Sequence, residues 1–281
     1  MKQRILPLIL LFALVLAVKG QTPLRYKYDL LYSETTINNG KSSLPVAAII
    51  DTGATFCVLD STFAVDSCNV RLDEAKKIRL VSADEAHVGA WETALDSLSF
   101  CGNTYRHVAC IVFNVAEKLQ HYAPRFFIGG NVLKEKPLLF NLKDMVVSTY
   151  DVPEPIVSYT MKWKGGEHFS KVGHSLIVLK AKVNGKRGHF ILDSGSRYNN
   201  LPRNIKLEAT REVDIETATA AKKLAMERVK VVDHAAVELG NQHLTLSFRL
   251  TNRRLGALNL DFLKGRSFVL NYAERTLMVL P

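Results

Sequence analysis

The feature that most constrains this chain is a short motif that occurs twice. Residues 47–59 read AAIIDTGATFCVL, and residues 189–201 read HFILDSGSRYNNL. Each segment is an apolar run followed by an aspartate, a hydroxyl residue and a glycine, so Asp51 and Asp193 occupy equivalent positions. An internal repeat of this kind predicts two similar structural units in one chain.

Two more pairs of segments support the repeat. Residues 98–103 (LSFCGN) resemble residues 237–241 (VELGN), and residues 131–142 (NVLKEKPLLFNL) resemble residues 261–272 (DFLKGRSFVLNY). The matches occur in the same order along the chain, and the separation between partners decreases slowly, as expected if the second copy has shorter loops. We therefore predict an internal duplication.

Both copies have the pattern of β structure. Short runs rich in Val, Ile, Leu and aromatic residues, such as residues 46–50, 176–183 and 268–272, are bounded by turn residues. An Asn-Gly pair, which favours a two-residue hairpin turn, precedes the strand that leads to each aspartate, at positions 39–40 and 184–185. The chain is therefore predicted to be mostly β.

Few segments have helical character. Residues 73–78 and residues 115–121 are helix candidates. The alanine-rich segment 216–228 fits either a helix or a strand, and the sequence does not decide between them.

The division between the two copies is marked by composition. Pro153 and Pro155 interrupt the strand pattern, and a stretch rich in Lys and Gly at residues 161–173 leads into the second copy. We predict an N-terminal lobe at residues 21–155 and a C-terminal lobe at residues 156–281.

The first residues predict export. Lys2 and Arg4 precede an apolar stretch at residues 5–18, and small residues follow it, which is typical of a secretory signal. The stretch is shorter than the about 20 residues that a membrane-spanning helix needs, so an N-terminal anchor and a buried helix are the less favoured alternatives. We predict a signal peptide at residues 1–20, cut before Gln21, and an exported protein, periplasmic or secreted, with no stable membrane insertion after cleavage.

An aspartate at the end of an apolar strand needs an explanation, because burying a lone carboxylate is costly. The following hydroxyl residue and glycine indicate a tight loop whose donors bond the carboxylate. A single motif would fit equally well an aspartate that caps a turn between strands. Two such motifs, one in each copy, favour a paired site in which Asp51 and Asp193 face each other.

These segments resemble a known family. The sequences IIDTGAT at residues 49–55 and ILDSGS at residues 191–196 resemble the active-site loops of aspartic proteases of the retropepsin-like kind. The second family element, two apolar residues and a glycine, matches residues 127–129 (FIG), whereas the second copy has Asn259 in place of the glycine. The chain is similar to the two-copy bacterial aspartyl proteases with a signal peptide, in which one chain supplies both halves of the active site.

The resemblance implies a mostly β fold of two retropepsin-like β-barrel lobes, related by pseudo-twofold symmetry, with the active site between them. Asp51 and Asp193 would be the catalytic pair. Two adjacent carboxylates do not both ionise easily, so they share one proton, which is the established behaviour of aspartic proteases. The charged member would act as general base on a water, and the protonated member would donate to the scissile carbonyl. This chemistry needs no metal and no cofactor.

The resemblance also implies roles for the neighbouring loop residues. Thr52 and Ser194 would orient the carboxylates from behind, and Gly53 and Gly195 would allow the two loops to meet. Arg197, four residues after Asp193, would point either toward the pair or into solvent.

In this family a hairpin flap covers the substrate, and residues 86–91 (AHVGAW) lie where the first copy would have it. The candidate flap residues are His87, Val88, Gly89 and Trp91. An ordinary surface hairpin with Trp91 in the core is the alternative.

Other functional classes have no support in the sequence. The motifs typical of zinc, thiol, serine and nucleotide chemistry are absent, and the eight histidines are scattered, so no metal site is predicted. The surplus of bases, 37 Lys and Arg against 27 Asp and Glu, is spread along the chain without interleaved aromatics, so no nucleic-acid partner is predicted. The four cysteines lie in the first copy and fit either disulfides, with three connectivities, or buried thiols.

We therefore predict a monomeric aspartic endopeptidase that hydrolyses peptide or protein substrates. A catalytically silent, protease-like peptide-binding module of the cell envelope is the first alternative, because Ser196, Arg197 and Asn259 depart from the family pattern. A structural envelope protein would explain export and basic charge, but it would leave the two matched aspartate loops unexplained.

Overall fold

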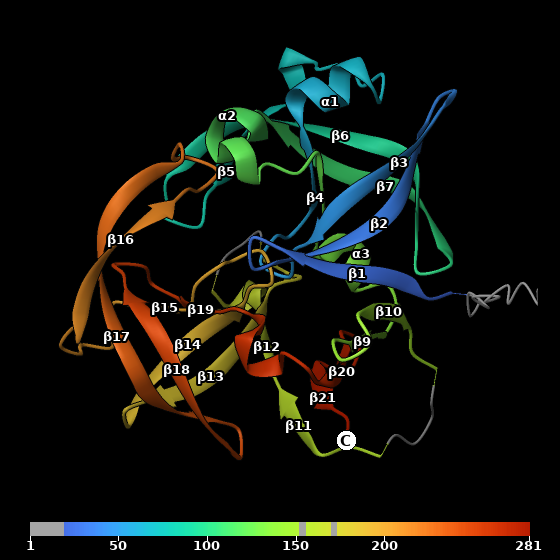
Figure 1. Cartoon of the computed structure of the whole chain (residues 1–281). Coiled ribbons are helices and arrows are strands. Elements are labelled where there is room, and N and C mark those ends of the chain that lie inside the picture. The colour runs from blue at the N-terminus through green and yellow to red at the C-terminus, as the bar shows by residue number, and fades with distance from the viewer. Residues whose placement is uncertain (1–19, 152–155, 170–172) are drawn as a thin grey trace, which may run out of the picture.

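A computed structural model of the chain describes residues 20–151, 156–169 and 173–281. The chain is mostly β, as the sequence predicted, and its strands form two sheets (Figure 1). The predicted signal segment, apart from Gly20, and the prolines at the predicted lobe boundary lie outside the described residues.

Six strands of the first half close into a ring, because the last strand in the order also pairs with the first. The ring has the order β2 (Leu30–Asn39), β3 (Ser42–Ile50), β8 (Phe126–Ile128), β4 (Cys57–Asp60), β7 (Asn103–Phe113) and β6 (His87–Phe100), with β6 returning to β2. Its interior is apolar and includes the fully buried side chains of Ile37, Leu59 and Phe126. We call this ring and its attached hairpin the N-lobe.

The second half contains a ring with the same order of equivalent strands. We call this ring and its attached hairpin the C-lobe. The order is β13 (Ile177–Val183), β14 (Lys186–Leu192), β19 (Gly256–Leu258), β15 (Asn200–Leu201), β18 (Gln242–Leu250) and β17 (Ala225–Leu239), with β17 returning to β13. The buried rings of Phe190 and Phe248 lie 6.0 Å apart in its core. The turn between β13 and β14 is the predicted Asn184-Gly185 pair, and both residues have positive φ angles, as a tight hairpin turn requires.

An antiparallel sheet joins the two halves of the chain. Its order is β11 (Tyr159–Lys162), β21 (Thr276–Val279), β20 (Ser267–Asn271), β9 (Leu138–Asn141), β10 (Val146–Thr149) and β1 (Thr22–Lys27), and β1 continues into the N-lobe ring. Strand β9 of the first half pairs with β20 of the second, and the buried rings of Phe140 and Phe268 stack there at 5.0 Å. This apolar contact holds the two halves in one body.

Each lobe extends a hairpin beyond its ring. In the N-lobe, β5 (Lys77–Val81) pairs with the first part of β6, and in the C-lobe, β16 (Arg211–Thr217) pairs with the first part of β17. The segment 216–228, undecided from the sequence, is therefore the end of this second hairpin. A short strand, β12 (Lys164–Gly165), adds to the edge of the C-lobe at β13.

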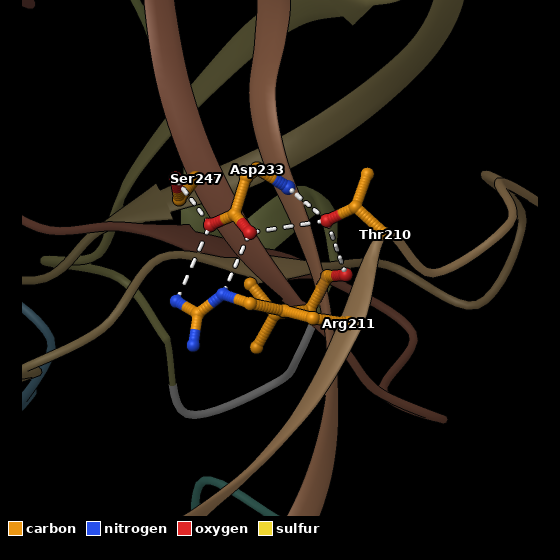
Figure 2. A network of polar contacts seen from close by, with 5 residues as sticks. Thr210, Arg211, Asp233 and Ser247 are labelled. Atoms are coloured by element: carbon orange, nitrogen blue, oxygen red, sulfur yellow. Dashed lines mark hydrogen bonds and ion pairs between the residues drawn. The ribbon is translucent and has the colours of Figure 1, made fainter.

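A polar network lies at the base of the C-lobe hairpin (Figure 2). The carboxylate of Asp233 accepts hydrogen bonds from Nε of Arg211 at 2.7 Å, from Oγ1 of Thr210 at 3.1 Å and from Oγ of Ser247 at 3.1 Å. The pairing of β17 with β18 shifts by one residue next to Asp233. The network therefore fixes β16, β17 and β18 to one another where the hairpin leaves the ring.

Helices are few and short. They are α1 (Ser61–Asp66), α2 (Val115–Leu119), α3 (Gly130–Leu133) and the 3₁₀ turns Glu74–Lys76, Gln120–Tyr122, Gly166–His168 and Leu260–Leu263. The predicted helix at residues 115–121 is confirmed, whereas the one at 73–78 is wrong except for a single 3₁₀ turn, because Asp73 caps that turn and Lys77 already begins β5. In the described ranges we find no helix with the length and apolar character to cross a membrane.

All four cysteines are buried free thiols. Cys57 and Cys110 are register partners on the neighbouring parallel strands β4 and β7, inside the N-lobe core. Of the two alternatives that the sequence left open, the structure therefore has buried thiols.

Candidate active site

The two aspartates follow directly after equivalent strands. Asp51 comes after β3 and Asp193 after β14, and each of these strands has a parallel neighbour, β8 or β19. The backbone N–H of Asp51 donates to Ile128 O at 2.9 Å, and that of Asp193 donates to Leu258 O at 2.8 Å. The parallel neighbour thus fixes the point at which each loop leaves its ring.

The two loops interleave so closely that only glycine fits between them. A Cβ atom on Gly53 would lie 2.5 Å from Oδ1 of Asp193, and one on Gly195 would lie 2.6 Å from Oδ1 of Asp51. Each carboxylate also accepts a hydrogen bond from the glycine of its own loop, at 2.9 Å for Asp51 and 3.1 Å for Asp193. The glycines therefore allow Asp51 and Asp193 to lie beside each other.

Thr52 and Ser194 bond to each other's loops in a reciprocal pattern. The N–H of Thr52 donates to Oγ of Ser194 at 2.9 Å, and the N–H of Ser194 donates to Oγ1 of Thr52 at 3.0 Å. Each hydroxyl then donates across to the opposite strand end, Thr52 to Leu192 O at 2.7 Å and Ser194 to Ile50 O at 2.6 Å. These buried hydroxyls contact the opposite loop rather than a carboxylate, so they position the aspartates by joining the two loops.

Burial and proximity change the acidity of the pair. Burial raises the pKa of Asp51 to about 7, and the negative charge of Asp193 contributes to the rise. Burial also raises the pKa of Asp193, but the positive charge of Arg253 opposes that rise. Both causes favour a pair that holds one shared proton, and the charge of Arg253 favours the ionised form of Asp193.

The departure at Asn259 leaves the loop of Asp193 intact. In the N-lobe, a Cβ at Gly129 would lie 2.2 Å from Phe56 O, so that position has no room for a side chain. Asn259 has room, and its Nδ2 donates to Arg197 O at 3.1 Å while its Oδ1 accepts from the N–H of Asp261 at 3.1 Å. Its side chain therefore supports the same loop that the glycine would have left unsupported.

The predicted flap residues lie on one arm of the N-lobe hairpin, not at its tip. His87, Val88 and Gly89 pair with β5 residues, and the turn itself is formed by residues 82–86. Trp91 is half-buried at the base of the hairpin, where its Nε1 donates to Oε1 of Glu74 at 3.3 Å. Its ring packs against the apolar core of the N-lobe, and its role as a cover over the substrate stays a prediction.

The sequence did not predict a second hairpin at the site. The turn of the C-lobe hairpin, residues 218–224, meets the turn of the N-lobe hairpin: Oγ1 of Thr219 donates to Oδ2 of Asp84 at 3.0 Å, and the N–H of Ala221 donates to Oγ of Ser82 at 3.3 Å. The same turn reaches α2, where the N–H of Leu224 donates to Lys118 O at 2.7 Å. Figure 1 shows the end of β16 beside β5 and α2.

The N-lobe has a second, smaller apolar cluster besides its main core. It contains Leu30, Tyr32, Ile49, Ala90, Ile111, Phe113, Val115 and Phe127, and Ala220 of the C-lobe hairpin packs against it. Ile49 lies on β3, two residues before Asp51. The end of the C-lobe hairpin therefore covers an apolar cluster that includes the strand leading to the loop of Asp51.

The arrangement of the described residues is suited to acid–base chemistry by two carboxylates. Within the described ranges, no group of three or more His, Cys, Asp or Glu side chains is placed to hold a metal ion.

Comparison with known proteins agrees with this chemistry. Residues 33–132 match a family model described as aspartyl protease. The matched region lies in the N-lobe and includes the loop of Asp51 and residues 127–129. No curated protein matches the chain. The match supports an aspartyl protease family for the N-lobe sequence.

Proposed function

We propose that this chain is an aspartic endopeptidase in which Asp51 and Asp193 together activate a water for peptide-bond hydrolysis. The observation that carries the proposal is the interleaving of the two loops, with the reciprocal bonds of Thr52 and Ser194 behind the carboxylates. This geometry brings two carboxylates from opposite halves of the chain to one point. Their electrostatic repulsion would destabilise the fold if both were ionised, so we propose that they share one proton and use it in catalysis.

The pKa directions support an assignment of roles. Asp51, whose pKa is about 7, holds the proton at acid and near-neutral pH, and Asp193, next to the charge of Arg253, carries the negative charge. Asp193 takes a proton from the water as its oxygen attacks the scissile carbonyl carbon, and Asp51 gives its proton to the carbonyl oxygen. When the tetrahedral intermediate collapses, the leaving nitrogen takes the proton from Asp193, and Asp51 recovers its own from the hydroxyl.

The substrate in this proposal is an extended peptide or a segment of a protein, held between the dyad and the two hairpins. The turns at residues 82–86 and 218–224 are bonded to each other, so they must separate before a peptide enters. Hairpin opening of this kind is a common gating step in enzymes.

The remaining parts of the proposal concern the whole chain. We propose a signal peptide at residues 1–20, export to the periplasm or the medium, and lobes at residues 21–155 and 156–281 that arose by duplication. One chain contains both aspartates, so the proposed enzyme acts as a monomer. In the proposed mechanism the two carboxylates activate the water, so the reaction needs neither metal nor cofactor.

The test is cleavage of a peptide library by the purified chain from residue 21 onward. Asp51→Asn and Asp193→Asn should each reduce cleavage by about 10⁴-fold or more, and the double variant should be no worse, since residues that act as a unit are not additive. Asp66→Asn, at an exposed aspartate at the end of α1, is the matched control and should keep full activity.

Activity that survives both substitutions would place the catalyst elsewhere. A folded wild type that binds peptides and cleaves none would favour the silent binding module instead.

A further inference from the structure

Three arginines of the C-lobe lie near one another, and the charge of one of them, Arg253, acts on Asp193. Arg197 follows Asp193 on the same loop, Arg249 lies near the end of β18, and Arg253 lies in the loop after it. Each is partly exposed. Burial is the main cause that lowers the pKa of Arg249 to about 10, and the charges of Arg253 and Arg197 add to that effect. The charges of Arg197 and Arg253 thus both act on the guanidinium group of Arg249.

The cluster lacks a carboxylate partner of its own. Four other arginines, Arg25, Arg211, Arg228 and Arg275, form ion pairs with acidic side chains. In the part of the chain that the structure describes, none of the three clustered arginines has a carboxylate oxygen within 4.0 Å. The charge of Arg253 acts on Asp193, but the like charges of the cluster still repel, and a bound anion would offset that repulsion.

The contacts that the cluster does make are to rings and to a neutral amide. The Arg197 guanidinium lies 4.5 Å from the ring centre of Tyr122 and 5.4 Å from that of Tyr198, and the Arg249 guanidinium lies 4.6 Å from the ring of Tyr198. Nε of Arg249 donates to Oδ1 of Asn200 at 2.9 Å. Nε of Arg197 is buried and has no hydrogen-bond partner. Stacking thus holds the guanidinium planes in place and leaves donors available.

The equivalent positions of the N-lobe have a different chemistry. Val58 pairs with Ile111 and Phe127 there, whereas at the same points of the C-lobe ring Asn200 pairs with Arg249 and Ala257. The two lobes therefore have apolar side chains and an arginine at matching places of their rings. A requirement of the fold would affect both lobes alike, so the difference points to the ligand.

We propose that Arg197, Arg249 and Arg253 form a subsite that binds a carboxylate of the substrate, so that the enzyme selects peptides with an acidic group near the cleaved bond. A guanidinium group binds a carboxylate with two parallel hydrogen bonds, which provides orientation as well as affinity. The carboxylate belongs either to an acidic side chain or to the C-terminus of the peptide. This inference rests on the proposed function, because it places a substrate at the dyad.

The experiment measures kcat/KM for one cleaved peptide and its relatives. Glu and Gln are compared at each of the positions around the scissile bond, and a free C-terminus is compared with its amide. We expect a preference of about 10- to 100-fold for the charged form at one position. A Glu-over-Gln preference identifies a side chain as the ligand, and an acid-over-amide preference identifies the C-terminus.

Variants connect the preference to the cluster. Arg197→Gln should remove most of the preference while the neutral peptide is still cleaved, and Arg197→Lys should restore part of it. Arg187→Gln, at an exposed arginine near the start of β14, is the matched control and should keep the preference. Thermal denaturation shows whether each variant is folded.

A binding arm separates this inference from the proposed hydrolysis. Asp51→Asn protein is titrated with fluorescent Glu and Gln peptides, with and without Arg197→Gln. If the wild type cleaves nothing but the Glu peptide binds more tightly in an Arg197-dependent way, the subsite stands and the hydrolytic function fails. Equal binding and equal cleavage of charged and neutral peptides, or no binding of any peptide, overturns the subsite.

Discussion

The N-lobe and the C-lobe share a strand order but differ in what surrounds the dyad. Each ring delivers its aspartate after an equivalent strand with a parallel neighbour. Beyond the aspartate loops the lobes diverge, because the N-lobe has an apolar cluster around Ile111 and Phe127 and the C-lobe has Arg249 with Arg197 and Arg253. The contacts that join the two loops are the ones that both lobes share.

The hairpins of the two lobes also differ, both in strand register and in the polar groups at their turns. The pairing of β6 with β7 keeps one register, whereas β17 shifts by one residue against β18, and Asp233 anchors that point to Arg211 (Figure 2). The N-lobe turn supplies acceptors, among them Asp84, and the C-lobe turn supplies donors, among them Thr219. Equivalent hairpins are thus complementary at their tips, while their strand pairing is similar.

We call the two aspartate loops, joined by the bonds of Thr52 and Ser194, the loop junction. If both lobes need this junction, equivalent substitutions in the two loops should reduce activity equally and strongly. Gly53→Ala and Gly195→Ala each add a Cβ about where the opposite carboxylate lies. A displacement of about 1 Å at a reacting group costs about 100-fold, so we expect kcat/KM to fall by at least that much in both variants. Kinetics with one good peptide substrate measures both losses.

Gly89→Ala is the control for these two variants, because it adds a Cβ atom outside the aspartate loops. A Cβ at Gly89 would make only an ordinary contact, 3.8 Å from Cε of Lys77, and residue 89 lies on the hairpin arm. We expect a change in kcat/KM of less than about threefold, within the usual range for a surface substitution. A large loss in this variant, or a loss confined to one of the two loop glycines, would contradict the shared junction.

Gly129 follows β8 in the N-lobe, and Asn259 follows β19 at the equivalent position of the C-lobe. We expect substitutions at these two positions to change the free energy of unfolding by different amounts. Gly129→Ala places a Cβ 2.2 Å from Phe56 O, and overpacking of this kind costs about 2 kcal/mol in the free energy of unfolding. Asn259→Gly removes a cap of the following 3₁₀ turn and the bond to Arg197 O, which costs about 1 kcal/mol. Urea denaturation gives both values, and equal values would show that the two positions have not diverged.

Local patterns were enough to predict the mostly β class and the helix at residues 115–121. The loops of Asp51 and Asp193 were also identifiable, because their motifs are short and their chemistry is unusual for a strand end. The expectation for residues 73–78 failed because the cap of a single turn has the same sequence signal as the start of a helix.

Long-range pairing determined what the sequence could not predict. Residues 216–228 become the end of a hairpin because β16 pairs over its whole length with the first part of β17, and local propensity alone does not specify this outcome. The arginine cluster could not be predicted either. Arg197 is far from Arg249 and Arg253 along the chain, and the parallel pairing of β15 with β18 brings them together. The charge that acts on Asp193 comes from Arg253, which the sequence analysis had not singled out.

The smallest effect that we expect concerns pH and follows from the same difference between the lobes. A pair that works with one proton is active between its two apparent pKa values, so hydrolysis should have a bell-shaped pH profile. The upper limb should lie near neutral pH, because burial and the charge of Asp193 raise the pKa of Asp51 to about 7. The positive charge of Arg253 holds down the pKa of Asp193, and no cation contributes in this way at Asp51. In Arg253→Gln the pKa of Asp193 rises, so the lower limb should move to higher pH, by less than about one unit because the guanidinium is partly exposed, while the upper limb stays in place. A pH series of kcat/KM with an uncharged peptide measures both limbs without involving the carboxylate subsite. A lower limb that moves to more acidic pH would contradict the role of Arg253, and hydrolysis that still rises above neutral pH would exclude a pair of aspartates that shares one proton.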